Sequence, residues 1–233
     1  MRALFYCLVL IVVVACGSSD SSSTGVSSTA EEAIKKVSKG EPKSMDVSEE
    51  ACVMLEDGVV SELFGVNPTQ LTYRRSIPVK RAGHVVCSAM WDFEDKAERE
   101  AAYTESVQGW SRGKATGKTD PMPKPPRLSA SVSITLMNSQ FDSAEEAVAD
   151  LESSVEYLAK GITVSVGGKD YERKTEFGDW IEGVGDKAIF TANGELLVAY
   201  NGSRFSVVVT VSDDPEMDRE QAIVLATHLM ENF

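Results

Sequence analysis

Ser111 stands in the motif that most resembles a catalytic site, Gly109-Trp-Ser111-Arg-Gly113. This spacing matches a G-x-S-x-G turn, which exposes a serine nucleophile between a buried strand and a helix. The histidine available downstream to take the serine proton is His228. However, charged residues typical of a helix precede Ser111, and a Gly/Pro-rich stretch follows it. We therefore assign no catalytic residue, and we keep a serine hydrolase that uses Ser111 and His228 as an alternative function.

Two further patterns also fail a check of their context. Gly183-x-Gly185-x-x-Ala188 imitates a dinucleotide-binding turn, but such a turn is followed by a helix, whereas here a hairpin is predicted. We expect these glycines to make a tight turn that Asp186 braces. The histidines, His84 and His228, are far apart in sequence and belong to no cluster with metal-ligand spacing. The sequence therefore predicts neither a cofactor nor a metal.

The segment 109–127 gathers positive charge in an otherwise acidic chain. Its Gly, Pro and Lys content predicts a mobile loop with an exposed tryptophan. The candidate partner contacts are Trp110, Arg112, Lys114, Lys118, Lys124 and Arg127. Such a loop suits an anionic partner, such as a phosphosugar, an acidic protein or a lipid headgroup. An ordinary solvated loop is the alternative, although long loops within compact domains are often functional.

The first 15 residues have the anatomy of an export signal. Met1-Arg2 is followed by an apolar run that ends at Ala15, too short to cross a bilayer, which takes roughly 20 residues. Val13-Val14-Ala15-Cys16 resembles the lipobox of bacterial lipoproteins. The resemblance implies that the chain is cut before Cys16, which then carries two or more acyl chains, enough for a stable membrane anchor. The alternative is a secretory signal in which Cys16 is incidental.

The residues after Cys16 indicate a tether and a destination. Residues 17–29 are rich in Ser and Gly, which is typical of a flexible linker, and we place the whole tether at 16–44. In Gram-negative lipoproteins an Asp directly after the cysteine favours the inner membrane. Gly17 stands there, so the resemblance implies the outer membrane if the host is Gram-negative.

Cys52 and Cys87 are the two cysteines that remain in the ectodomain. Cys52, Leu55, Val59 and Leu63 recur at helical spacing, and the alternation around Cys87 is typical of a strand. Both sulfurs are thus predicted to point into one core. An oxidising compartment favours their pairing, and we expect a structural disulfide. Two buried free thiols, or a redox pair, are the alternatives, although no CxxC spacing supports redox work.

The overall charge argues against one class of partner. The chain has a net charge of −13, and removal of the signal takes away Arg2 and leaves −14. Nucleic-acid binding depends on Lys and Arg contacts to phosphate, so we exclude nucleic acid as a partner. The acidity also opposes contact with anionic lipid, which assigns membrane attachment to the acyl chains. Solubility is the simplest explanation of the charge.

Periodicity and turn residues predict an α+β ectodomain over 45–233, with helices on one face of a mostly antiparallel sheet. The predicted helices are 48–64, 94–108, 143–159 and one that begins at Asp214-Pro215. The predicted strands are 71–74, 84–93, 128–136, 162–166, 187–192, 195–200 and 203–211. Asn-Gly pairs separate the last three strands, which we expect to form a meander that precedes the last helix. Residues 167–186 are predicted to be loop.

The order of these elements is similar to that of certain uncharacterised envelope lipoproteins, best known from actinobacteria. The shared features are a cysteine-bearing helix, the C-x-x-x-W of Cys87 to Trp91, and Gly183-Val-Gly-Asp186 before a meander and a helix. Since those families have no common activity, the resemblance supports only the fold and the disulfide.

The sequence as a whole predicts a lipid-anchored, non-enzymatic binding or scaffolding module of the cell envelope. Its partners would be the membrane, through Cys16, and an envelope protein or an anionic glycan. The alternatives are the hydrolase above and a carrier of a small apolar ligand. The oligomeric state is left open.

Overall fold

The computed structural model describes residues 52, 55, 58–76, 84–137 and 141–232. The predicted signal and tether, residues 1–44, lie outside the described residues, as does most of the predicted helix before residue 58. Within the described ranges the α+β prediction is confirmed.

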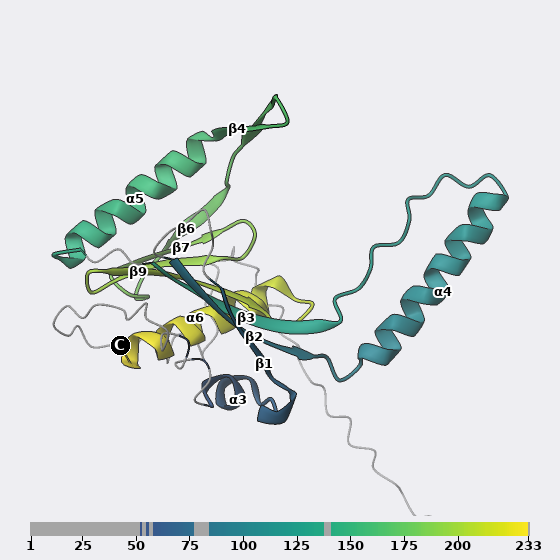
Figure 1. Ribbon diagram of the computed structural model, residues 1–233, viewed down its shortest axis with the longest axis horizontal. Coiled ribbons are helices and arrows are strands. Elements are labelled where there is room, and N and C mark those ends of the chain that lie inside the picture. The colour runs from purple at the N-terminus through teal and green to yellow at the C-terminus, as the bar shows by residue number, and fades with distance from the viewer. Residues whose placement is uncertain (1–51, 53–54, 56–57, 77–83, 138–140, 233) are drawn as a thin grey trace, which may run out of the picture.

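A seven-stranded sheet forms the centre of the molecule, in the order β1-β2-β3-β9-β8-β7-β6, with every neighbouring pair antiparallel (Figure 1). Its strands are β1 (Thr72–Ser76), β2 (His84–Asp92), β3 (Ser129–Met137), β6 (Phe177–Ile181), β7 (Lys187–Thr191), β8 (Leu196–Tyr200) and β9 (Ser203–Thr210). β4 (Ile162–Val166) and β5 (Lys169–Arg173) form a separate hairpin.

The helices begin and end largely where capping residues predict. They are α3 (Val59–Phe64), α4 (Lys96–Ala115), α5 (Ala144–Lys160) and α6 (Pro215–Asn232), with a 3-10 turn η2 (Pro68–Gln70). Ser143 caps α5 by accepting a hydrogen bond from the Glu146 amide at 3.2 Å, and Asp214 accepts one from the Glu216 amide at 3.0 Å. Among the described residues, no helix combines the length and apolar character needed to cross a membrane.

The two faces of the sheet are covered by different helices. The larger core, against α3 and α6, contains Ala188 and Val198, whereas Ile189 and Leu197, which alternate with them, pack with Leu151 of α5. Successive residues of a strand point to opposite faces, so α5 lies on the face opposite α6. The prediction that all helices pack on one face is therefore wrong for α5. Ion pairs of Arg204 with Asp150 and of Lys187 with Glu152 fasten α5 to its face.

The predicted meander is confirmed, and it contains one more strand than expected. Asn201 and Gly202, between β8 and β9, both have positive φ, 51° and 80°, which the two central residues of a type I′ turn need. β6 extends the meander on the other side of β7, so the predicted loop over 167–186 in fact contains β5 and β6.

Cys52 and Cys87 form a disulfide, as predicted, with their Cα atoms 5.3 Å apart. Both residues are buried, at 5% and 1% exposure, in the core beneath α6. The bond joins residue 52 to β2, which is next to the edge strand of the sheet.

Candidate functional site: the projecting arm and the open face of the sheet

Residues 93–128 form an arm that leaves the body of the protein between β2 and β3 (Figure 1). At its base the Phe93 amide donates to the Leu128 carbonyl at 3.1 Å, which continues the pairing of β2 with β3. The arm is thus an enlarged hairpin connection. It consists of α4, none of whose residues is buried, and a Pro-rich segment that returns alongside the helix. We use the name tip of the arm for residues 108–126, which are the last eight residues of α4 and the return segment that follows them.

The six predicted contact residues do not all lie on a loop, as the sequence had suggested. α4 continues to Ala115, so Trp110, Arg112 and Lys114 lie on a helix and not on a mobile loop. Trp110 is half-buried, and its indole N–H donates to the Asp120 carbonyl at 2.8 Å. This hydrogen bond holds the return segment against α4. The prediction of a loop with an exposed tryptophan is corrected in both respects.

A groove of about 290 Å³ lies between α4 and the return segment at the tip. Its lining residues are Gly109, Trp110, Gly113, Lys114, Lys118, Asp120, Pro121 and Pro123. The Lys114 ammonium lies 5.7 Å from the centre of the Trp110 ring. The aliphatic stem of Lys118 crosses α4 at Gly113. A Cβ added at Gly113 would lie 3.1 Å from the Cδ of Lys118. The groove therefore places the Lys114 ammonium beside the Trp110 indole, and the Lys118 side chain lines the same groove.

The tip carries positive charge that is not neutralised by its neighbours. Residues 108–126 contain four basic residues and a single acidic one, a net charge of +3 in a chain of −13. Among the described residues Arg112, Lys114, Lys118 and Lys124 form no ion pair. Arg112 and Lys114 also lie in the last turn of α4, where cations complement the helix dipole. Although both side chains complement the dipole, they stay exposed and can still contact solvent or a ligand.

Arg99 fastens the first half of the arm base to the body. Its guanidinium pairs with Asp95 and with Asp213, each at 2.7 Å, and lies 4.5 Å from the centre of the Phe93 ring. The hydrogen bond from Arg99 lowers the pKa of Asp95. Nearby, the hydrogen bond from Lys96 lowers the pKa of Asp92, and a second one from Ser129 adds to the effect.

Arg127 fastens the second half of the base, and so it is not a free contact residue. It donates to the Ser212 carbonyl at 2.6 Å and pairs with Asp218 at 3.3 Å. Asp218 is 9% exposed and also accepts hydrogen bonds from the amides of Val211 and Ser212. Sequence reasoning missed Asp213 and Asp218, because no local pattern links residues that are about 90 positions away from the arm.

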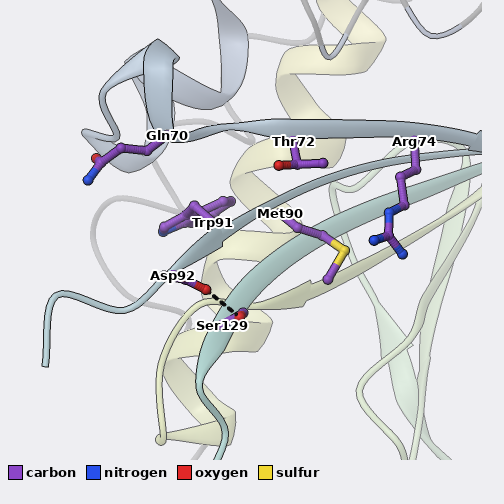
Figure 2. Close-up of a pocket in the computed structure, with 7 residues that line it drawn as sticks. All are labelled: Gln70, Thr72, Arg74, Met90, Trp91, Asp92 and Ser129. Carbon is purple, nitrogen blue, oxygen red and sulfur yellow. Dashed lines mark hydrogen bonds between the residues drawn. The ribbon is translucent and has the colours of Figure 1, made fainter. Parts of the chain in front are cut away.

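A second hollow, of about 400 Å³, lies beside β1, β2 and the start of β3, near the base of the arm (Figure 2). It is lined by Gln70, Thr72, Arg74, Met90, Trp91, Asp92 and Ser129. Arg74 forms no ion pair among the described residues, and Asp92 accepts a hydrogen bond from Ser129 at 2.9 Å. Five of the seven lining side chains are polar, which does not favour a purely apolar ligand. Only the shared parity of Thr72 and Arg74 along β1 could have indicated this hollow from sequence.

The structure does not bring Ser111 and His228 together. Ser111 lies within α4, near the end that is far from the body, whereas His228 lies on α6, on the other side of the molecule (Figure 1). Ser111 also lacks the strand-to-helix turn of a serine nucleophile, because the helix is continuous through it. The His228 Nε2 atom lies 3.4 Å from the Asn232 amide nitrogen.

Gly183 and Gly185 form a turn, as predicted, but Asp186, which was expected to brace this turn, instead bonds to the turn between β8 and β9. Both glycines have positive φ, and the Asp186 carboxylate accepts a hydrogen bond from the Asn201 amide at 2.6 Å. A strand, β7, follows the turn in place of the helix of a dinucleotide site. Within the described ranges, no group of three or more His, Cys, Asp and Glu side chains could hold a metal ion.

The comparisons with known proteins give no family for the chain. No family model, no curated protein and no solved structure matches it.

Proposed function

We propose that the protein is a lipid-anchored, extracytoplasmic binding module of the cell envelope, and that the groove at the tip of the arm binds an anionic glycan. The observation that carries the proposal is the groove itself. It is lined by Lys114, Lys118 and Trp110, with the Lys114 ammonium over the indole, and it lies on an arm whose helix has no buried residue.

The chemistry of the groove favours a glycan over a peptide. An indole offers a broad apolar face on which the C–H groups of a sugar ring can lie. The two lysines beside it can neutralise a carboxylate, phosphate or sulfate on the same sugar or the next one. Exposed cations without partners lose little in binding an anion, because no existing ion pair has to break.

The envelope location rests on two sequence features and is supported by the disulfide. The signal with Val13-Val14-Ala15-Cys16 predicts export and acylation, with the outer membrane as the destination in a Gram-negative host. Disulfides persist in oxidising compartments outside the cytoplasm. The Cys52–Cys87 bond is consistent with such a compartment.

The groove is tested by titration with dextran sulfate, with neutral dextran of equal length as the comparison. We expect saturable binding of dextran sulfate only, which weakens as salt is added because the contacts are between exposed charges. Lys114→Gln with Lys118→Gln should weaken binding at least tenfold. Gly109→Leu should weaken it without a change of charge, since a side chain at Gly109 meets open space beside the groove.

The matched control removes two positive charges from the body. Lys160→Gln with Arg219→Gln breaks two exposed pairs within helices and should leave dextran sulfate binding nearly unchanged. Equal weakening by both double variants would mean that net charge, not the groove, governs binding, and would refute the proposal. Recovery of an acidic envelope protein that requires Lys114 and Lys118, with no glycan binding, would replace the glycan by a protein partner.

The anchor is tested separately by intact-mass spectrometry of the protein extracted from membranes. A mass that begins at Cys16 and includes acyl chains is expected. A mass without lipid would make the protein secreted or periplasmic, and the membrane-anchored part of the proposal would be withdrawn.

A further inference from the structure

The β4–β5 hairpin projects from the body beyond the end of α5, as Figure 1 shows. The two strands pair only with each other and belong to no larger sheet. The turn between them is Gly167-Gly168, both with positive φ. A two-stranded hairpin is marginally stable in water by itself, so one whose apolar face is exposed gains stability when another surface covers that face.

The two faces of this hairpin differ sharply in chemistry. Val164 pairs directly with Tyr171, and Ile162 with Arg173, so these four side chains share one face together with Lys169. The opposite face carries Thr163, Ser165, Asp170 and Glu172, and Ser165 donates a hydrogen bond to Asp170 there. One face is thus apolar and basic, and the other is hydroxylated and acidic.

The apolar and basic face is exposed. Val164 is 38% exposed and Tyr171 is 54% exposed, which places them among the large apolar side chains left uncovered in the described residues. Lys169 and Arg173 form no ion pair within the described part of the chain. The face therefore offers a tyrosine and a valine flanked by two cations whose charge is not neutralised, in a chain of net charge −13.

We propose that this face of the β4–β5 hairpin lies on the surface of an anionic lipid bilayer. Tyrosine is enriched at the membrane interface, where its ring contacts the acyl region and its hydroxyl stays among the headgroups. The net charge of −13 opposes contact of the chain as a whole with anionic lipid, so the attraction is local: Lys169 and Arg173, beside the tyrosine, attract the anionic headgroups to this face. The acidic face of the hairpin then points away from the membrane, so the charge pattern sets the orientation as well as the contact.

The contact can be weak and still matter. An acyl anchor on the same chain makes hairpin binding an intramolecular event at high effective concentration. The inference rests on the proposed envelope location, and it does not depend on the arm or on the nature of the arm's ligand. It would give the ectodomain a fixed orientation on the membrane rather than free rotation on its tether.

The test uses the chain from residue 16 onward with Cys16→Ser, so that no acyl chain contributes. Its binding is measured by flotation with phosphatidylcholine vesicles that contain or lack phosphatidylglycerol. We expect binding to the anionic vesicles that falls with added salt. Val164→Ser with Tyr171→Ser should weaken it about tenfold, and Lys169→Gln with Arg173→Gln should weaken it similarly.

Two further variants keep the inference testable if the double serine variant fails to form the hairpin. Tyr171→Trp should retain binding, and brominated lipid should quench the added fluorescence. Thr163→Ser with Glu172→Gln, on the opposite face, should not weaken binding.

Three results would overturn the inference. The first is the absence of binding to anionic vesicles. The second is binding that Lys114→Gln with Lys118→Gln abolishes while the hairpin variants do not, because the arm would then be the lipid contact. The third is self-association that Val164→Ser with Tyr171→Ser abolishes, because a second copy of the chain would then cover the face. Failure of acylation at Cys16 would instead leave vesicle binding by this unlipidated chain intact, so the two proposals fail separately.

Discussion

Gly185 lies so close to β8 that no side chain fits at this position. A Cβ there would come within 2.6 Å of the Ala199 carbonyl oxygen and 2.9 Å of a Val198 methyl, and the residue has a φ of 61°. Gly167, in the hairpin turn, has nearly the same φ of 60°, but no atom lies within 4 Å of its Cβ position. A comparison of substitutions at these two glycines therefore distinguishes the cost of backbone strain from the cost of steric overlap.

We predict that Gly185→Ala lowers the free energy of unfolding by about 3 kcal/mol or more, because overlap with backbone adds to the strain of positive φ. Gly167→Ala should lower it by only about 1 kcal/mol, the cost of the backbone conformation alone. Urea unfolding of both variants measures the difference. Equal losses would show that the approach to Ala199 relaxes without cost.

The disulfide closes a loop with a sequence separation of 35 residues. We predict that its removal by Cys52→Ala with Cys87→Ala lowers the free energy of unfolding by about 3–4 kcal/mol, because the unfolded chain regains loop entropy. Urea unfolding with and without reductant measures this value. The double variant should not respond to reductant, and Cys16→Ser should respond as the original chain does. A reductant effect that persists in the double variant would contradict the prediction.

Some of these residues were predictable from sequence and others were not. Pairing of Cys52 with Cys87 followed from two local periodicities that both point inward. Trp110 was misplaced because glycines at positions 109 and 113 lower helix propensity and suggested a loop. In the structure the return segment packs on α4 there, through the Asp120 carbonyl and the stem of Lys118 across Gly113. That packing is invisible to a local window.

At the scale of elements, the arm base is where the orientation of α4 is decided. The pKa values of Asp92 and Asp95 are lowered by hydrogen bonds from Lys96 and Arg99, respectively. A carboxylate whose folded-state pKa lies below its ordinary 3.8 contributes fully above that value, and its contribution is lost as the pH falls through the lowered pKa. The ion pairs and hydrogen bonds of Asp92 and Asp95 at the arm base should thus persist at neutral and mildly acidic pH.

We predict that the arm keeps one orientation from about pH 8 down to the ordinary carboxyl pKa of 3.8, and that it loosens only as the pH falls further, through the lowered pKa values of Asp92 and Asp95. Spin labels at Glu105 in α4 and Met217 in α6 would show this as a broadened distance distribution. Arg99→Gln should broaden it at neutral pH, because the pairs with Asp95 and Asp213 are lost. Arg219→Gln, which breaks a pair within α6, is the control. A distance distribution that stays narrow in Arg99→Gln would contradict this role for the ion pairs of Arg99.

The elements that sequence predicted best carry strong local patterns. β3 alternates buried Ala, Val, Ile and Leu with Ser and Thr, and Asn-Gly pairs mark the turns on either side of β8. β5 was missed because Lys169–Arg173 is exposed throughout and contains a single large apolar residue. The side of the sheet on which α5 packs was also misjudged, because an amphipathic stripe shows that a face is buried but not against which side of a sheet.

At the scale of the whole molecule, the arm is an insertion that the fold does not need. β2 pairs with β3 up to Asp92 and Ser129, so a tight turn could join them. We predict that replacement of residues 95–126 by Asn-Gly shifts the thermal midpoint by no more than about 4 °C, since α4 buries no residue in the core. The same change should abolish dextran sulfate binding. A fall of about ten degrees or more would show that the contacts at the arm base, such as those of Arg99, stabilise the sheet itself.

The class of the whole fold was predictable because hairpin signals outnumber crossover signals along the chain. Its outline was not, since nothing in the local sequence states that one connection leaves the body as an arm or that the β4–β5 hairpin stands apart from the sheet. The candidate site shows the same division. Its residue types were identified from charge and composition, and its geometry arises from contacts across the arm.

The disulfide also fixes how the molecule would carry mechanical load. If the N-terminal segment is held at a membrane and a partner pulls on the arm, tension passing along the chain reaches Cys52 and crosses the covalent bond to Cys87 in β2. The intervening residues, among them α3 and β1, are shielded from that force. The arm departs from the end of the same strand, at Asp92. The force therefore passes through the residues of β2 between Cys87 and Asp92, and the other strands of the sheet bear little of it.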